Sequence, residues 1–251
     1  MEPAPKVSIV LPTYNGERFL RSSIESCINQ TFRDWELIIV DDTSTDSTPE
    51  IIADLEIADS RIRSSRNPEN LRLPRSLNRG FELARGDYLT WTSDDNDFHP
   101  DALKRMIEEL EREPAPDLVY ADYHQIDEQG NPLPDVINDP PEALIHRNSI
   151  GGCFLYRRGV HESLNGYDTE RFLAEDYDFW SRAFLEFKFR TIHEFLYVVR
   201  RHAGSLTSKQ PASVLKATAD VIARNLQTMH TAPRSQKSLG RQKLALLNME
   251  L

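Results

Sequence analysis

Short apolar runs alternate with amphipathic segments along the first 120 residues of the chain. The run at 7–11 is mostly apolar, as in a strand buried on both faces, and segment 17–29 repeats its apolar residues at helical spacing. This alternation predicts strands at 7–11, 37–40, 61–65, 88–91 and 118–120, and helices at 17–29, 47–57, 74–84 and 101–112. Strand and helix in strict alternation favour right-handed crossovers and a mostly parallel sheet with helices on both faces.

One of these helices has a recognisable start signal. Ser47 and Glu50 have the spacing of a capping box, and Pro49 suits a first helical turn because its missing N–H would have no partner there. We therefore expect the Ser47 side chain to cap the helix at 47–57.

The pattern changes after residue 120. Four prolines between positions 132 and 141 predict a surface loop. Beyond it the sequence predicts strands at 153–156 and 196–201, and helices at 175–186, 212–229 and 235–249. We therefore predict an α/β fold with a Rossmann-like, mostly parallel central sheet flanked by helices. Its parts are a first half at 1–120, a second half of the same domain at 121–208, and a C-terminal helical extension at 209–251.

The composition is that of an ordinary globular protein, with 39% hydrophobic and 28% charged residues among 251. Forty acidic residues against 30 basic ones give a formal charge of -10, which argues against a nucleic acid partner. No segment approaches the ~20 apolar residues of a membrane-spanning helix, and the start of the sequence shows no secretory leader. The two cysteines, Cys27 and Cys153, fit no zinc spacing. We expect a soluble, cytoplasmic protein.

Polar clusters follow three of the predicted strands, at 12–16, 41–44 and 93–96. In an open parallel sheet such clusters meet at one edge, where ligands bind. The third cluster contains Asp94 and Asp95 and is followed by Asp97. These three carboxylates carry more negative charge than one helix cap uses. A divalent cation, Mg²⁺ or Mn²⁺, would relieve this repulsion and would bring substrate phosphates with it. Taken alone, Asp41 and Asp42 fit a helix cap equally well.

The residues around these clusters carry a resemblance to a known family. The segments are VSIVLPTYNGERFLRSSIESCINQTFRDWELIIVDDTSTDST, NLRLPRSLNRGFELARGDYLTWTSDDNDFHPDAL and GYDTERFLAEDYDFWSRAF. In this order they resemble the family 2 glycosyltransferases of the glycosyltransferase-A fold, with motif wording most similar to the SpsA-like enzymes. The resemblance implies an inverting, metal-dependent enzyme that moves a sugar from a nucleoside-diphosphate sugar, UDP-linked above all, to an acceptor hydroxyl in bacterial surface polysaccharide or glycoconjugate synthesis. The first half would then bind the donor and the second half the acceptor.

The resemblance also implies roles for individual residues in the nucleotide site. The nucleotide-binding residues would be Pro12, Tyr14, Asp41, Arg72 and Asp94. Asp41 would accept a hydrogen bond from the uracil N–H, and Asp94 would lie near the ribose. Arg75 competes with Arg72 for the contact with the base.

The implied metal ligands are Asp95 and His202, holding Mn²⁺ or Mg²⁺. Thr92 stands where the commoner form of the motif has its first aspartate, so metal binding would rest more heavily on Asp95. We expect Asp97 only to cap the helix that follows.

The resemblance assigns the catalytic base to Asp176, with Glu175 as its neighbour and a contact for the acceptor. A sugar hydroxyl is a poor nucleophile at neutral pH, so a carboxylate must take its proton during attack. Acids in a first helical turn also complement the helix dipole, so a structural role for this pair stays open. Gly151, Gly152 and Arg200 would lie near the diphosphate or the acceptor.

Two other functional classes stay open from the residues alone. The string IIVDD resembles the acidic pocket of a phosphoacceptor signalling domain, and Thr92 is compatible with a catalytically silent nucleotide-sugar binding module. The C-terminal segments 212–229 and 235–249 suit either a peripheral contact with the inner face of the membrane or a homodimer. Polysaccharide, lipid-linked sugar and protein acceptors all stay open.

Overall fold

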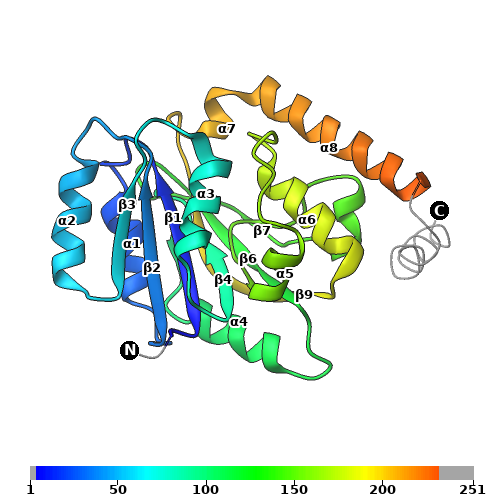
Figure 1. Ribbon diagram of the computed structural model, residues 1–251, viewed down its shortest axis with the longest axis horizontal. Helices are drawn as coiled ribbons and strands as arrows, with labels where there is room; N and C mark the ends of the chain where they lie inside the picture. Colours follow the sequence, from blue (N-terminus) through cyan, green and yellow to red (C-terminus); the bar gives the residue numbers. More distant parts are fainter. Residues whose placement is uncertain (1–3, 232–251) are drawn as a thin grey trace.

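A nine-stranded sheet runs through the computed structural model, which describes residues 4–231 (Figure 1). Eight strands follow the order β3-β2-β1-β4-β8-β6-β9-β5, and β7 pairs with β6 beside that path. The strands are β1 (Val7–Thr13), β2 (Trp35–Asp41), β3 (Ile62–Arg66), β4 (Tyr88–Trp91), β5 (Asp97–Phe98), β6 (Leu118–Asp127), β7 (Pro132–Val136), β8 (Phe154–Arg157) and β9 (Phe189–Arg201). The helices are α1 (Leu20–Ile28), α2 (Thr48–Ala58), α3 (Arg72–Leu83), α4 (Ala102–Glu111), η1 (Pro141–Ile145), α5 (Arg158–Ser163), α6 (Glu175–Glu186), α7 (Leu206–Lys209) and α8 (Pro211–Thr231).

The four strands β3, β2, β1 and β4 are parallel and confirm the sheet predicted for the first half. Every residue of β1 and β2 is buried, which explains why their sequences are apolar runs without alternation. The register pairs Thr13 with Asp41, so the two strands end at the same level. The polar residues that follow them therefore meet at one edge of the sheet.

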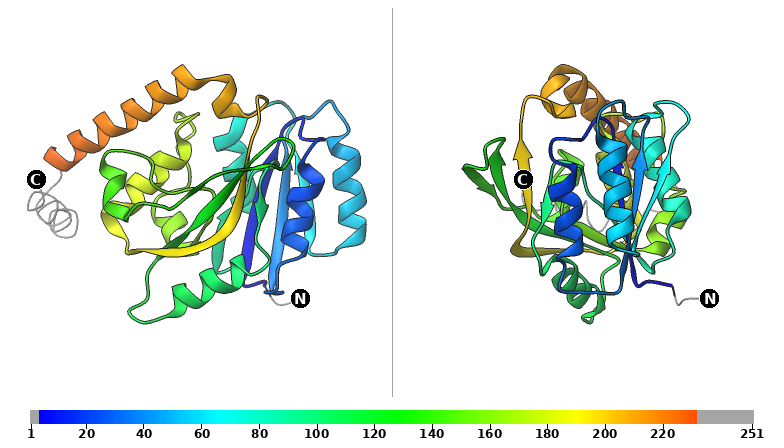
Figure 2. Two further views of the ribbon diagram at one scale, coloured as in Figure 1. Left: turned by 180° about the vertical axis from the view of Figure 1, so that it is seen from behind. Right: turned by 90° about the vertical axis from the view of Figure 1, so that its left-hand side faces the viewer.

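Helices cover both faces of the sheet, as predicted (Figure 2). On one face α1, α2 and α4 pack Ile24, Leu55 and Met106 against the strands. On the other face α3 and α6 contribute Leu77 and Trp180 to a second core. Within the described part of the chain, every helix is too short or too polar to cross a membrane.

The second half departs from the predicted parallel order. Strand β8 runs antiparallel between β4 and β6, and β5 is antiparallel to β9. The segment 132–136, predicted as a loop, forms β7 and pairs antiparallel with β6. Its prolines are compatible with this position because β7 is an exposed edge strand, where a missing N–H leaves no ladder partner unsatisfied.

Helix α2 begins where it was expected, but with a different cap. The Ser47 side chain makes no capping hydrogen bond. Instead the carboxylate of Asp46 accepts from the Thr48 amide (3.0 Å), and that of Glu17 accepts from the Ser47 amide (3.0 Å). Two carboxylates thus satisfy N–H groups that a helix start leaves without partners, one of them from a distant segment. Pro49 lies in the first turn, as predicted.

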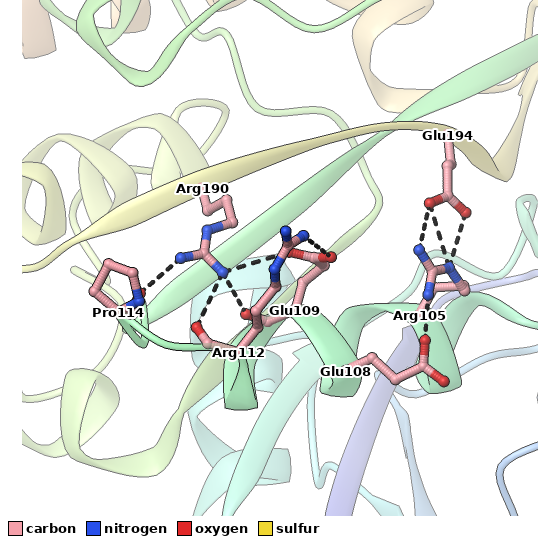
Figure 3. A network of polar contacts seen from close by, with 7 residues as sticks. All are labelled: Arg105, Glu108, Glu109, Arg112, Pro114, Arg190 and Glu194. Atoms are coloured by element: carbon pink, nitrogen blue, oxygen red, sulfur yellow. Dashed lines mark hydrogen bonds and ion pairs between the residues drawn. The ribbon is translucent and has the colours of Figure 1, made fainter.

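Helix α4 is fastened to β9 by a network of arginine contacts (Figure 3). Arg105 donates to both carboxylate oxygens of Glu194, at 3.0 and 2.7 Å. Arg190 donates to the carbonyl oxygens of Glu109 (2.9 Å) and Pro114 (2.6 Å). Bidentate contacts of this kind fix orientation as well as distance, so the network holds β9 in place against α4.

Helix α8 confirms the segment predicted at 212–229, and α6 coincides with the helix predicted at 175–186. The helix predicted at 235–249 lies outside the described residues. A buried ion pair joins the two observed helices. Asp178 of α6 is fully buried, accepts a hydrogen bond from Arg182 (2.8 Å) and forms an ion pair with Arg224 of α8.

Asp178→Asn is expected to lower the free energy of unfolding by about 3 kcal/mol, because it leaves two arginine side chains without their buried partner. Urea denaturation measures this change. Asp220→Asn removes the same charge from an exposed position of α8 and should change stability by less than about 0.5 kcal/mol. Equal unfolding midpoints for the two variants would contradict the role of this ion pair.

Candidate functional site

A cavity of about 770 Å³ lies beyond the carboxyl ends of β1, β2 and β4. Its walls come from segments far apart in the sequence, at 12–19, 70–76, 91–95, 172–173 and 202–213. Of the site residues predicted from the sequence, it collects Pro12, Tyr14, Arg72, Asp94, Asp95 and His202. The other predicted residues, Asp41, Gly151, Gly152, Glu175, Asp176 and Arg200, lie outside its lining.

The carboxylate of Asp41 is turned away from the cavity, contrary to the prediction. One oxygen accepts from the guanidinium of Arg66 on β3 (2.7 Å), and the other accepts from the Ser44 amide (2.8 Å). Asp41 is the last residue of β2 and is buried. Its contacts hold the loop after β2 against β3.

Asp42, one residue later, lines the cavity in its place. Its Oδ1 accepts from the Leu71 amide (2.8 Å) and from Asn67 (2.7 Å), and its Oδ2 accepts from the Arg72 amide (2.8 Å). The carboxylate therefore accepts hydrogen bonds from two backbone N–H groups at the start of α3. A carboxylate has about four acceptor positions, so one remains for a ligand.

Arg72 lines the cavity, whereas Arg75 does not, and this placement separates the two competing arginines. Arg75 instead pairs with Glu170 (3.7 Å). The backbone of Arg72 has φ 66°, an uncommon conformation for a residue with a side chain, and the hydrogen bond that its N–H donates to Asp42 helps to hold it. Its guanidinium lies 5.2 Å from the ring centre of Phe172, which also lines the cavity.

Asp94 lines the cavity and accepts a hydrogen bond from the Thr13 hydroxyl (2.5 Å). Burial, together with repulsion from Asp95, raises the pKa of Asp94 to about 6. Gly16 is required beside it, because a Cβ at this position would lie 2.4 Å from the Asp94 carboxylate. The glycine of the segment after β1 therefore makes room for the carboxylate that follows β4.

Asp95 and His202 lie together in the cavity wall. Nε2 of His202 is 2.9 Å from Oδ2 of Asp95, and the imidazole packs edge-on against Phe19 with ring centres 5.1 Å apart. Among residues 4–231 there is no cluster of three or more histidine, cysteine or acidic side chains that could hold a metal. In this part of the chain, Asp95 and His202 are the paired side chains at the cavity wall that could hold a cation.

The remaining residues of the acidic motif have structural contacts. Thr92 is fully buried, and its hydroxyl lies 2.6 Å from that of Tyr197. We expected Asp97 to cap α4, but it forms part of β5 instead. It accepts from Ser22 (2.8 Å) and from Arg200 (3.3 Å). Within this motif, only Asp94 and Asp95 among the acids face the cavity.

The predicted base and its neighbour stand at the first turn of α6, just beyond the cavity residue Leu173. Asp176 accepts hydrogen bonds from Asn148 (2.8 Å) and from the Tyr177 amide (2.7 Å). Glu175 is buried, and its Oε2 has no hydrogen-bond partner. Burial raises the pKa of both carboxyl groups, and in Glu175 repulsion from Asp176 adds to it.

Gly151, Gly152 and Arg200 pack against side chains rather than against the cavity. A Cβ on Gly151 would lie 2.3 Å from the ring of Tyr123, and one on Gly152 would lie 2.6 Å from the ring of Tyr197. Arg200 lies over the ring of Phe19 at 4.7 Å, and the same ring packs against His202. The glycines therefore permit close packing of the two tyrosine rings, and Arg200 packs on Phe19, the ring that contacts His202.

Several cavity residues had no place in the prediction, above all the cations Arg18 and Lys209. Arg18 follows the polar turn after β1, pairs with Glu128 (2.7 Å) and stacks over Phe19. A search for basic residues near the acidic motifs would have found Arg18, because an acidic protein needs cations to hold a phosphate. Lys209 has no local signal, since α7 meets the cavity only through the tertiary fold. Trp91 was likewise missed.

Residues 8–164 of the chain match the family model described as "Glycosyl transferase family 2". Among known proteins, the chain is 34% identical over 212 residues to a protein of Bacillus subtilis described as glycosyltransferase EpsE, an alignment that covers 82% of this chain and 76% of EpsE. It is 32% identical over 154 residues to the B. subtilis protein described as teichuronic acid biosynthesis glycosyltransferase TuaG, covering 59% of this chain and 60% of TuaG.

Two solved structures share the fold. Residues 1–349 of S. aureus TarS, in complex with UDP-GlcNAc, superimpose with a TM-score of 0.75 at 17% identity, over 95% of this chain and 71% of that 1–349 chain. The mannosyltransferase PcManGT of Pyrobaculum calidifontis, in complex with GDP-Man and Mn²⁺, gives a TM-score of 0.62 at 15% identity, over 98% of this chain and 81% of that protein. These likenesses confirm the predicted glycosyltransferase-A type of α/β fold.

Proposed function

The chain belongs to glycosyl transferase family 2, an inverting family of enzymes that use nucleotide sugars, and on this basis we propose that its donor is a UDP-sugar, its cofactor Mn²⁺ or Mg²⁺, and its acceptor a hydroxyl of a polysaccharide or glycoconjugate. The observation that carries the proposal is the content of one cavity. Asp42 offers a carboxylate for the nucleobase, and Arg72 and Lys209 offer cations for the diphosphate. Asp95 and His202 form a carboxylate–imidazole pair for the metal. All five residues line the cavity.

Asp95 and His202 fit a divalent cation. Their polar atoms already lie within 2.9 Å of each other at the cavity wall, and two protein ligands leave positions for phosphate oxygens and water. The imidazole makes Mn²⁺ a better fit than Mg²⁺, which demands oxygen ligands. PcManGT, which shares the fold, was crystallised with Mn²⁺. When bound, the metal would neutralise charge on the departing diphosphate.

The chain's own residues would then perform a single displacement. Asp176 takes the proton of the acceptor hydroxyl as its oxygen attacks the anomeric carbon. The bond between that carbon and the diphosphate oxygen breaks on the opposite side, and the electron pair leaves with UDP. Arg18, Arg72 and Lys209, which all line the cavity, would hold the phosphates. One displacement inverts the anomeric centre.

TuaG, with its teichuronic acid name, supports a polysaccharide or glycoconjugate acceptor. Such an acceptor suits an enzyme that works in the cytoplasm, free or at the inner face of the membrane. The exposed Leu215 on α8 is compatible with a peripheral membrane contact or a homodimer there. The phosphoacceptor alternative receives no support, because Asp41 is buried and paired with Arg66.

We assign recognition of the nucleobase, uracil, to Asp42 in place of Asp41. Uracil carries a hydrogen on N3 that a carboxylate can accept, whereas N3 of cytosine has a lone pair that would repel it. The wild-type protein should therefore bind UDP about thirtyfold more tightly than CDP in isothermal titration calorimetry, and Asp42→Asn should remove most of this preference.

Asp41→Asn is the matched control, since it alters the adjacent carboxylate outside the cavity. It should keep the preference for UDP over CDP even if it lowers stability. Equal affinities of the wild-type protein for UDP and CDP would refute the base assignment, and the absence of any nucleotide binding would refute the proposed donor.

A further inference from the structure

The indole of Trp91 forms part of the cavity wall and has no part in the proposed displacement or in nucleotide binding. Trp91 is the last residue of β4, three positions before Asp94. Successive side chains of a strand point to opposite faces, so Trp91 lies opposite Thr92 and packs beside the core under α3 and α6. Its ring is only partly buried, whereas Trp35 and Trp180 are 2% and 0% exposed.

The orientation of this ring is fixed by its neighbours. The indole N–H donates to the hydroxyl of Tyr167 (2.9 Å), whose own ring stacks on Phe179 with centres 4.5 Å apart. Phe154 packs against the indole at an angle of 67°, with centres 5.8 Å apart. Because the single polar atom of the Trp91 side chain is already paired, the surface that the ring offers to the cavity is apolar and aromatic.

Trp91 lies on the side of the cavity nearer to α6. Strand β4 stands between β1 and β8, and the cavity residue Leu173 directly precedes the first turn of α6. The diphosphate would sit at Asp95, and the attacking hydroxyl would sit at Asp176. The sugar ring must lie between these two carboxylates, and Trp91 with Leu173 forms the apolar wall on that path.

We propose that Trp91 is a specificity-determining residue whose indole face stacks on the hexose ring of the donor. This inference rests on the proposed function, because it needs a sugar nucleotide in this cavity. The C–H bonds on one face of a pyranose carry partial positive charge, and the face of an aromatic ring is negative, so the two surfaces attract each other. The stack would bind the sugar and leave its hydroxyl groups free for polar contacts. In this arrangement the nucleotide and the diphosphate would lie away from Trp91.

Intrinsic fluorescence tests the contact directly, because the other two of the chain's three tryptophans, Trp35 and Trp180, are buried. The probes are UDP, UDP-glucose and UDP-N-acetylglucosamine with Mg²⁺, and acrylamide serves as quencher. At least one UDP-hexose is expected to protect Trp91 from acrylamide where UDP does not. Trp91→Phe should remove this difference. Identical quenching with UDP and with both UDP-hexoses would overturn the assignment.

Calorimetry on the same ligands separates a sugar contact from a structural role. Trp91→Leu is expected to weaken binding of the protecting UDP-hexose about tenfold and to leave UDP affinity unchanged. Trp91→Phe keeps an aromatic face and the packing, so its loss should be smaller, and it supplies the comparison if the leucine variant is unstable. Equal losses for UDP and UDP-hexose would overturn the proposal. Failure of the wild-type protein to bind UDP at all would instead overturn the proposed function, and this inference with it.

Discussion

Asp176→Asn is expected to lower kcat about a thousandfold while UDP affinity stays close to that of the wild-type protein. Asp176 stands outside the cavity lining, at the start of α6, so its replacement removes no contact with the nucleotide. Asparagine has nearly the same shape and can still accept the hydrogen bond from Asn148, but it cannot take a proton from the acceptor. Steady-state release of UDP gives kcat, and calorimetry with UDP gives the affinity.

The pH dependence of kcat provides a second test of the same base. Burial raises the pKa of Asp176, and hydrogen bonds from the Tyr177 amide and from Asn148 oppose that increase. The base must be deprotonated, so kcat should fall as pH drops through this raised pKa, in a titration shared with Glu175. Asn148→Ala removes one opposing bond and should move the acidic limb to higher pH. Full activity of Asp176→Asn, or an acidic limb that does not move, would contradict the assignment.

The sequence predicts the elements of this fold better than their order in the sheet. Strands β1 and β2 and helix α6 follow from local apolar patterns, since burial of their side chains requires those patterns. The antiparallel insertion of β8 between β4 and β6 depends on pairing between residues far apart, such as Leu89 with Tyr156. Nothing in the local pattern of β8 distinguishes a parallel from an antiparallel neighbour.

The sequence predicts Asp41 in the nucleotide site, whereas Asp42 lines the cavity, and this error has a specific physical cause. In a strand buried on one face, alternation of polar and apolar residues shows which way each side chain points. Every residue of β2 is buried, so its sequence carries no such alternation. The motif places two carboxylates at the strand end, but only the tertiary structure shows that Asp41 meets Arg66 and that Asp42 meets the cavity.

The far walls of the cavity lie beyond local prediction for a different reason. Leu173 and Arg72 face it with positive φ angles of 76° and 66°, conformations that side chains adopt only when the surrounding structure holds them. Asp97 illustrates the same limit: its short strand β5 exists because β9 returns from a hundred residues later to pair with it. The acidic motifs predict where the site lies, and the long-range contacts determine which residues line it.

Asp95→Asn is expected to lower kcat/KM about a thousandfold, because the metal's stabilisation of the leaving diphosphate is worth several kcal/mol. The variant should also lose the effect of Mn²⁺ on UDP affinity. In the wild-type protein, calorimetric titration with UDP should show tighter binding in Mn²⁺ than in EDTA, because Asp95 and His202 would hold the cation, which would supply positive charge for the phosphates. In Asp95→Asn the two titrations should nearly coincide, since His202 alone is a weak site.

Asp97→Asn separates this effect from the general loss of negative charge. It removes the same charge only two residues away, but the carboxylate of Asp97 contacts Ser22 and Arg200 and lies outside the cavity lining. The Asp97 variant should therefore keep the difference between the titrations in Mn²⁺ and in EDTA, and most of kcat/KM. If both variants lose the Mn²⁺ effect equally, the cation responds to the overall field of the acidic motif. If the wild-type protein binds UDP equally in Mn²⁺ and in EDTA, Asp95 and His202 hold no metal, and Arg18, Arg72 and Lys209 alone must carry the diphosphate.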